Sequence, residues 1–264
     1  MNARPADVAF LDDRRPVGPV YRLIIAVDIE GSTTRTDPVK GELRRVIYDV
    51  LGQALAAVAI TGDRLEGLAD RGDGILVLVR SHDDVPKTVL LDRLIPLLAA
   101  KLGEYNAQAA YPALRMRLRA VVHAGDIRLD RRGWYGEAID VAIRLLDAPR
   151  VKGTLKQATA PLVLVISDEI HSAVVRHGYV DPDTYGQLVH VRVAGRRHRG
   201  WVHVPAAVPA PAAVSPSPVG PAPGGRLAGA SRQPAYPITE KRAPDRIAVI
   251  AGRTRGTRAG PAAG

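Results

Sequence analysis

Two acidic residues stand where the local sequence predicts the end of a strand or the tip of a turn. Asp28 directly follows the apolar run 23–27, and Asp73 lies in Gly72-Asp73-Gly74, between two further strand-like segments. In a split βαβ sheet the first strand and the hairpin that follows it are neighbours, so their ends can bring both carboxylates into one site. Paired carboxylates without nearby cysteine or histidine suit hard cations such as Mg²⁺. Two such ions can activate an attacking oxygen and neutralise a leaving phosphate.

A short turn directly after Asp28 adds a second chemical possibility. Gly31-Ser32-Thr33 offers backbone N–H groups, which can bind phosphate oxygens. Asp-Gly is also the commonest hairpin chemistry, so Asp73 taken alone is equally consistent with a simple turn residue. Asp28 is different, because an acid that ends five apolar strand residues lies either at the solvent rim or in a functional site.

Strands and helices are predicted to alternate in the segment that carries these residues. The order strand, helix, strand, strand, helix, strand is the split βαβ pattern of ferredoxin-like palms, an α+β fold, here with a further helix and further strands appended. The strand that contains His123 is expected to end at Ala124-Gly125-Asp126. The expected strands are 22–28, 64–71, 75–80, 116–123, 161–166, 188–193 and 200–204, and the expected helices are 39–59, 85–102, 136–146 and 168–176.

Composition excludes several classes of protein. The chain has no cysteine, which rules out disulfides, thiolate zinc sites and cysteine nucleophiles. Its longest apolar runs are far shorter than the roughly 18 residues of a membrane span. The first residues contain no apolar signal core. We therefore expect a cytoplasmic protein with no membrane association.

Charge and low-complexity sequence divide the chain into three parts. After residue 205 there are eight basic residues and two acids, a balance of +6 out of +10 for the whole chain. This segment is rich in Ala, Pro and Gly, and such sequences bury too little apolar surface to fold. We expect a flexible N-terminal arm over 1–19, one domain over 20–205 and a disordered Ala/Pro-rich basic tail over 206–264. Because the excess charge lies mostly on the tail, nucleic acid is not the expected partner.

Four motifs in order resemble those of the class III adenylate/guanylate cyclases. AVDIEGST resembles the first metal motif of that family, and RGDGILVLV resembles the hairpin that supplies the second metal carboxylate. VVHAGDI is similar to the strand that runs into His-x-Gly, and YGEAIDVAIRLLD is similar to the family helix Gly-x-x-Val-Asn-x-Ala-x-Arg-Leu. The resemblance covers about residues 20–205, and the ferredoxin-like fold that it implies agrees with the predicted strand order.

The resemblance implies cyclisation of a nucleoside triphosphate to a 3′,5′-cyclic monophosphate with loss of pyrophosphate, using two Mg²⁺ or Mn²⁺ ions. Arg144 matches the arginine that stabilises the transition state, and its permanent charge suits that role. In the family this arginine comes from the opposite subunit, so a homodimer is implied. The other implied positions are Asp28, Ile29 and Asp73 for the metals and Gly31, Ser32 and Thr33 for the phosphates.

Three positions depart from the family pattern. The asparagine that orients the ribose is Asp140 here, and Asp140 is four residues from Arg144, a spacing at which the two could pair on one helix face. The two positions that read a purine base are Ala69 and Gly133, so both base-reading side chains are missing from this predicted base pocket.

These features leave three interpretations open. The first is an active nucleotidyl cyclase with altered base specificity, because both metal acids and Arg144 are present. The second is a catalytically inactive cyclase homologue that binds a nucleotide or acts as a dimerisation regulator, which the change to Asp140 favours. The third is an unrelated palm-like domain that its basic tail tethers to nucleic acid.

Overall fold

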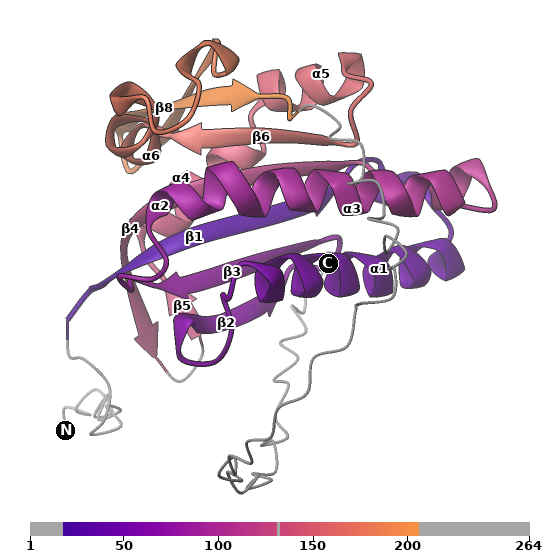
Figure 1. Ribbon diagram of the computed structural model, residues 1–264, viewed down its shortest axis with the longest axis horizontal. Helices are drawn as coiled ribbons and strands as arrows, with labels where there is room; N and C mark the ends of the chain where they lie inside the picture. Colours follow the sequence, from indigo (N-terminus) through magenta and orange to yellow (C-terminus); the bar gives the residue numbers. More distant parts are fainter. Residues whose placement is uncertain (1–17, 131–132, 206–264) are drawn as a thin grey trace, which may run out of the picture. The chain divides into compact units, whose positions relative to one another are not determined.

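A computed structural model describes residues 18–130 and 133–205 of the chain (Figure 1). The predicted tail, 206–264, and all but the last two residues of the predicted arm, 1–19, lie outside the described residues. No helix in the described ranges is both long enough and apolar enough to cross a membrane.

The described residues form one mixed sheet with helices on both faces (Figure 1). The sheet order is β2-β3-β1-β4-β6-β8-β7, with β5 paired to β4, and its first four strands have the 2-3-1-4 order of a ferredoxin-like unit. This confirms the predicted α+β fold with appended elements. The strands are β1 (Val20–Ile29), β2 (Leu65–Asp70), β3 (Gly74–Arg80), β4 (Leu118–Asp130), β5 (Gly133–Tyr135), β6 (Leu162–Ser167), β7 (Gln187–Val193) and β8 (Arg196–His203), and the helices are α1 (Asp37–Ala57), α2 (Lys87–Val89), α3 (Ile95–Gln108), α4 (Glu137–Leu146), α5 (Pro149–Gln157) and α6 (Asp168–Ala173).

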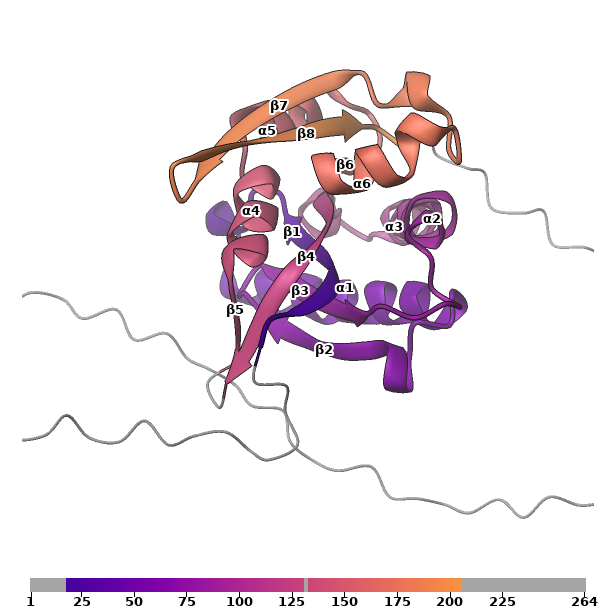
Figure 2. The ribbon, with the colours of Figure 1, turned by 90° about the vertical axis from the view of Figure 1, so that its left-hand side faces the viewer.

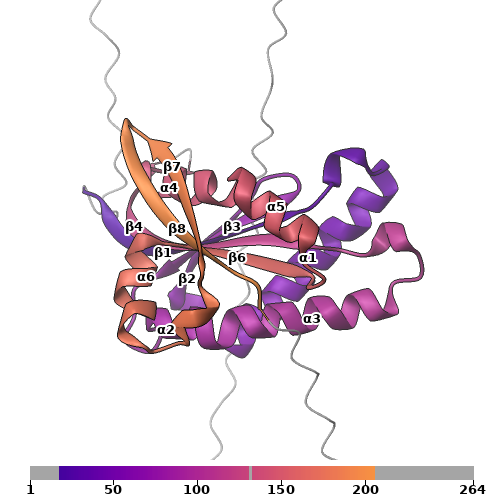
Figure 3. The same ribbon diagram turned by 90° about the horizontal axis from the view of Figure 1, so that it is seen from above.

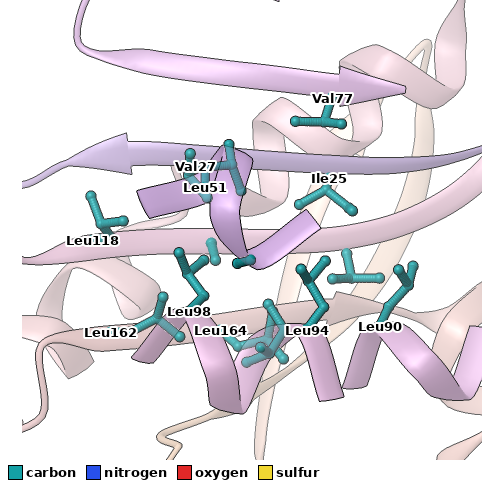
Figure 4. Close-up of a cluster of buried hydrophobic side chains, with 14 of the residues drawn as sticks. Ile25, Val27, Leu51, Val77, Leu90, Leu94, Leu98, Leu118, Leu162 and Leu164 are labelled. Carbon is teal, nitrogen blue, oxygen red and sulfur yellow. The ribbon is translucent and has the colours of Figure 1, made fainter. Parts of the chain in front are cut away.

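Both faces of the central strands are buried, which explains the continuous apolar run in β1. Ile25 and Val27 pack with α1 and α3 on one face, where Figure 4 shows the aliphatic cluster that they join. Ile24 and Ala26 pack with α4 and α5 on the other face. Figure 3 shows these two helical layers on opposite sides of the sheet. A strand covered on both faces has no polar side to alternate with its apolar one.

The expected end of the fourth strand at residue 123 is wrong. β4 continues to Asp130 and pairs antiparallel with β5, opposite Gly133–Tyr135. Gly125, which seemed to end the strand, is a packing residue, because a Cβ atom placed there would lie 2.8 Å from the Cβ of Ala138 on α4. The glycine therefore allows α4 to lie close against the strand.

Three other boundaries also differ from the predictions. The helix expected over 85–102 is interrupted by a π-helical turn at Leu90–Leu94 and continues as α3 to Gln108. α5 was not expected, and it begins at Pro149, a residue that fits the first turn of a helix. β8 begins at Arg196, because a tight two-residue turn at Ala194-Gly195, both with positive φ, joins it to β7.

Candidate active site

The two candidate metal carboxylates lie side by side at one end of the central strands. Asp28 pairs with Gly74 in the antiparallel ladder between β1 and β3, so Asp73, one residue before Gly74, lies beside it. The backbone N–H of Ile29 donates a 3.0 Å hydrogen bond to the carbonyl oxygen of Asp73, which fixes the turn against the end of β1. The structure thus brings together the three predicted metal positions, Asp28, Ile29 and Asp73.

Gly74 allows this close approach. A Cβ atom at Gly74 would lie 2.5 Å from the carbonyl oxygen of Val27 and 3.5 Å from the Oδ1 atom of Asp28. No real side chain tolerates the first contact without movement of the backbone. The glycine after Asp73 is therefore required by the spacing between β1 and β3, in addition to any role in the turn.

The predicted phosphate-binding turn lies directly against Asp73. Gly31 has a left-handed backbone with φ of 67°, and a short 3₁₀ helix at Ser32–Thr34 follows it. The buried hydroxyl of Ser32 donates a hydrogen bond to the Oδ2 atom of Asp73, whereas Thr33 is exposed. Ser32 thus orients one metal carboxylate, a role that the sequence analysis did not assign to it.

Arg119 forms an ion pair with Asp28. The two residues are register partners in the ladder between β1 and β4, and an Nη2 group of Arg119 contacts the Oδ2 atom of Asp28. The other end of the same guanidinium lies 3.1 Å from Asp147, which also pairs with Lys152 at 3.1 Å. Arg119 is 11% exposed and Asp28 is 17% exposed, so this ion pair is largely shielded from water.

The electrostatic environment of Asp28 opposes its ionisation. Burial, Asp73 and Asp147 together raise the pKa of the Asp28 carboxyl to about 6, with burial the largest cause, although Arg119 acts in the opposite direction. Two carboxylates this close, one of them desolvated, form a site that a bound cation would stabilise. A carboxyl group with a strongly raised pKa beside a second carboxylate is often found at a functional site.

Two cavities meet at Asp73. One, of about 240 Å³, is lined by Asp28, Asp73, Arg71, Arg119 and Asp147 together with apolar residues of β1 and α4. The other, of about 340 Å³, lies on the side of the turn and the start of α1 and is lined in part by Ser32, Thr33, Lys40 and Arg44. A carboxylate-rich space and a space that carries cations are thus adjacent, an arrangement suited to metal ions and to phosphate groups.

The sequence analysis assigned none of the cations that line these cavities, among them Arg119, Arg44 and Lys40. Arg119 lies inside a strand, so its proximity to Asp28 depends on the register of β4. Arg44 forms an ion pair with Asp70 and donates a 2.7 Å hydrogen bond to the carbonyl oxygen of Gly72, which anchors the turn before Asp73 to α1. Lys40 lies one helical turn earlier on α1. The spacing of Lys40 and Arg44, at i and i+4 on α1, was the signal that could have indicated a shared face.

Asp140 and Arg144 are exposed on α4, and in the described ranges neither side chain forms an ion pair or hydrogen bond with Asp28 or Asp73. Neither is among the residues that line the cavity around Asp28. Within the described part of the chain no ion pair joins Asp140 to Arg144, so the pairing that their spacing permits is not formed. Figure 2 shows α4 across the face of the sheet next to the hairpin of β7 and β8.

The two predicted base-pocket positions lie in one region. Ala69 packs on the same apolar cluster as Trp134, which directly follows Gly133 in the chain. The indole of Trp134 covers Gly67, where a Cβ atom would lie 2.5 Å from the ring. Its Nε1 atom is buried and has no hydrogen-bond partner within the described residues. Trp134 thus covers β2 at Gly67, two residues before Ala69.

The donor set fits a hard divalent cation. Mg²⁺ is usually held by one or two carboxylates, with substrate phosphates and water supplying the remaining ligands. Asp28 and Asp73 supply two carboxylates, and the desolvated state of Asp28 is relieved by a cation. No group of three or more His, Asp or Glu side chains within the described residues forms a self-sufficient metal site. The arrangement therefore suits ions that arrive with a phosphate ligand.

Comparison with solved structures identifies the fold. The adenylate/guanylate cyclase/hydrolase from Silicibacter pomeroyi matches with a TM-score of 0.51 and 21% identity, over 72% of this chain and 99% of that one. The guanylyl cyclase Cya2 gives a TM-score of 0.48 at 19% identity, over 75% of this chain and 98% of that one. No protein-family model matches the chain, and no curated protein does.

The chain therefore has the fold of a class III nucleotidyl cyclase catalytic domain, as its motifs predicted. The low identity makes it a divergent example of that fold. Because a fold hosts many functions, the activity has to be argued from the site itself.

Proposed function

We propose that this protein is a divergent class III nucleotidyl cyclase that converts a nucleoside triphosphate into a 3′,5′-cyclic nucleotide and pyrophosphate. The observation that carries the proposal is the pairing of Asp28 with Gly74, which sets Asp73 beside Asp28 at the end of β1. The backbone N–H groups of the adjoining turn at Gly31 and Thr33 and the guanidinium of Arg119 are suited to bind the oxygens of a triphosphate. The absence of polar, base-reading side chains at Ala69 and Gly133 supports altered base specificity.

Each residue has a proposed task. Asp28, Asp73 and the backbone carbonyl of Ile29 would hold two Mg²⁺ or Mn²⁺ ions. These ions, when bound, would lower the pKa of the ribose 3′-hydroxyl and neutralise charge on the triphosphate. Ser32 holds the carboxylate of Asp73 in place through its hydrogen bond.

The basic residues would bind and stabilise the phosphates. Arg119 lies at the carboxylates and can exchange its contact with Asp28 for a phosphate oxygen once a cation neutralises that acid. The backbone of the turn at Gly31 and Thr33 would donate to other phosphate oxygens. A guanidinium suits this task because its planar fork matches two phosphate oxygens at once.

The second subunit would complete the site. Arg144 and Asp140 are exposed and, within the described residues, do not pair with Asp28 or Asp73 of their own chain, which supports a homodimer in which they face the partner's triphosphate. Arg144 would stabilise charge on the transferred phosphoryl group. Asp140 would contact the ribose, where a carboxylate accepts hydrogen bonds from hydroxyl groups but adds repulsion toward phosphate.

Product analysis tests the proposal. The full chain is incubated with ATP, GTP, CTP or UTP and with Mg²⁺ or Mn²⁺, and cyclic monophosphates are sought by mass spectrometry. The comparison variants are Asp28→Asn, which removes a metal carboxylate, and Asp126→Asn, which removes an exposed acid farther along β4. We expect product with one nucleotide from the unaltered chain and from Asp126→Asn, and none from Asp28→Asn.

A different outcome would favour the second candidate. Two observations support a catalytically inactive cyclase homologue that binds nucleotide: Asp140 replaces an amide, and Arg119 occupies one oxygen of Asp28. No cyclic product from any nucleotide, in a folded dimeric sample that still binds a nucleoside triphosphate, would favour this regulator over an enzyme.

A further inference from the structure

A second polar cavity lies away from the paired carboxylates, where β6 ends before its neighbours. The β4–β6 ladder ends at the pair Val122 and Ile166, and the β6–β8 ladder ends at the pair Ser167 and Gly200. β4 continues beyond this point, and β8 begins four residues earlier than Gly200, at Arg196. Figure 2 shows the hairpin of β7 and β8 diverging from β4 past the end of β6. Where a strand stops between two that continue, an open sheet offers a crevice for a ligand.

This gap, which we call the β6 slot, has a volume of about 270 Å³. Its size suits an inorganic anion or the end group of a small metabolite, since pockets for larger ligands start near 300 Å³. Its floor is polar, because the buried side chains of His123 and Ser167 are joined by a 2.7 Å hydrogen bond. The lining residues of the slot are His123, Ala124, Val141, Ser167, Asp168, Glu169, Arg197, His198 and Arg199.

The acids of the β6 slot already have partners. Asp168 accepts two hydrogen bonds from Arg199, at 2.9 and 3.1 Å. Glu169 accepts a 2.8 Å hydrogen bond from the hydroxyl of Tyr21 and lies 3.3 Å from the Nζ atom of Lys87. The carboxylates of the slot are therefore engaged by the protein and leave little capacity for a cationic ligand.

Two nitrogen-bearing groups of the slot remain available. The side chain of Arg197 forms no ion pair and no hydrogen bond within the described part of the chain. The Nε2 atom of His198 is buried and has no hydrogen-bond partner among the described residues, and Glu137 lies 3.7 Å from it, beyond hydrogen-bond distance but within ion-pair distance of a protonated imidazole. A buried polar nitrogen without a partner is costly and calls for a ligand that supplies one.

We propose that the β6 slot binds a small oxyanion, a phosphate or carboxylate group, held by Arg197 and His198. A guanidinium can donate hydrogen bonds to two oxygens of either group. An imidazole N–H can donate one further hydrogen bond to an oxygen of the same group. The proposal is independent of nucleotide cyclisation, because the slot shares none of its lining residues with the cavities at Asp73.

The test follows the imidazole of His198 by NMR in the full chain, with its signal assigned by loss in His198→Gln. Inorganic phosphate and acetate are titrated separately, and chloride at matched ionic strength gives the reference. Because the signal comes from His198, it reports anion binding in the β6 slot and not phosphate binding near Lys40 and Arg44. We expect a saturable shift with at least one oxyanion, at least tenfold weaker binding in Arg197→Ala and less than a twofold change in Arg192→Ala.

Arg192 is the matched control because it pairs with Arg197 across the hairpin and is exposed, yet does not line the slot. A response to phosphate alone would identify a phosphorylated ligand, and a response to acetate alone would identify a carboxylate. The proposal is overturned if neither anion shifts His198 beyond the effect of chloride, or if Arg197→Ala binds as tightly as the unaltered chain. Asp28→Asn should leave anion binding in the β6 slot unchanged. A failure of the cyclase proposal can therefore be distinguished from a failure of the anion-binding proposal.

Discussion

Arg119 and Asp28 form an ion pair directly across the ladder between β4 and β1. The arginine also reaches Asp147, so one guanidinium joins the end of β1 to the residue that follows α4. The pair holds the Asp28 carboxylate in position while no cation is bound. It also keeps a guanidinium at the place where the metals and the triphosphate are proposed to meet.

Replacement of Asp28 by asparagine should remove activity and raise stability. At pH 8 the carboxyl is ionised although its pKa is raised to about 6, mainly by burial, so the charge costs folding free energy that an uncharged amide avoids. With EDTA present, we expect a gain of about 1–2 kcal/mol, which is about 2–8 °C in Tm for a domain of this size. Thermal unfolding by circular dichroism measures the gain, and Asp126→Asn serves as the control. A lower Tm in Asp28→Asn would contradict this account of the site.

Gly74→Ala should damage the site through the backbone. The new Cβ atom would lie 2.5 Å from the carbonyl oxygen of Val27, so β3 and the turn at Asp73 must move. We expect a loss of about 1–3 kcal/mol in the free energy of unfolding, as for overpacked core positions. The matched variant is Gly52→Ala on α1, where a Cβ atom has open space and alanine should add about 0.5–1 kcal/mol. Equal urea midpoints for the two variants would show that the close approach is unimportant.

The positions of Asp28 and Asp73 could be predicted from the sequence alone because the signals that mark them are local. An acid after an apolar strand and an Asp-Gly hairpin can be recognised without knowing the tertiary structure, and both stand where they were expected. Arg119 could not be recognised in this way, because its contact with Asp28 depends on which strands pair and in which register. A shift of one residue would place it on the other face of the sheet.

Glycine explains two of the errors in the predicted boundaries. Gly125 and Gly200 were taken as the end and the start of strands, yet both lie inside strands at places where α4 packs closely. A Cβ atom at Gly200 would lie 2.8 Å from the side chain of Leu145. Turn glycines and packing glycines have the same local sequence appearance, and only the position of the neighbouring helix distinguishes them.

Complementation tests the proposed division of the site between subunits. A chain with Arg144→Ala and a chain with Asp28→Asn should each be inactive. If each site takes its acids from one subunit and Arg144 from the other, mixed dimers contain one intact site. Co-refolding at equal amounts should then restore about a quarter of the unaltered activity. No recovery in a sample shown to contain mixed dimers would place both residues in the same chain's site.

His123 should make folding stability dependent on pH. Burial lowers the pKa of its imidazole to about 4, so the unfolded chain binds a proton that the folded chain does not between about pH 6.5 and 4. This contribution to stability is complete above pH 6.5 and is lost as the pH falls. At pH 5 the loss is about 2 kcal/mol. The free energy of unfolding, measured with urea, should fall between pH 8 and pH 5. In His123→Gln this fall should be smaller by about the same amount. An equal fall in the variant and the unaltered chain would contradict the role given to His123.

The boundary at residue 205 can be tested by truncation. If 20–205 is one complete domain, removal of residues 206–264 deletes no part of its core. We expect the Tm of the shortened chain to remain within about 2 °C of the full chain, since changes outside the core have small effects. A fall of 5 °C or more would show that the removed segment packs on the domain.

The two tryptophans of the chain lie in different functional regions. Trp134 covers β2 beside Ala69, whereas Trp201 stacks on His171 at 3.8 Å and lies under Arg199, next to the β6 slot. Since there is no third indole, a single Trp→Phe replacement leaves one tryptophan, and the indole fluorescence, excited selectively over the tyrosines, reports on one region only. The protein thus carries its own pair of optical probes, through which the proposed nucleotide binding and the proposed anion binding can be tested separately without any added label.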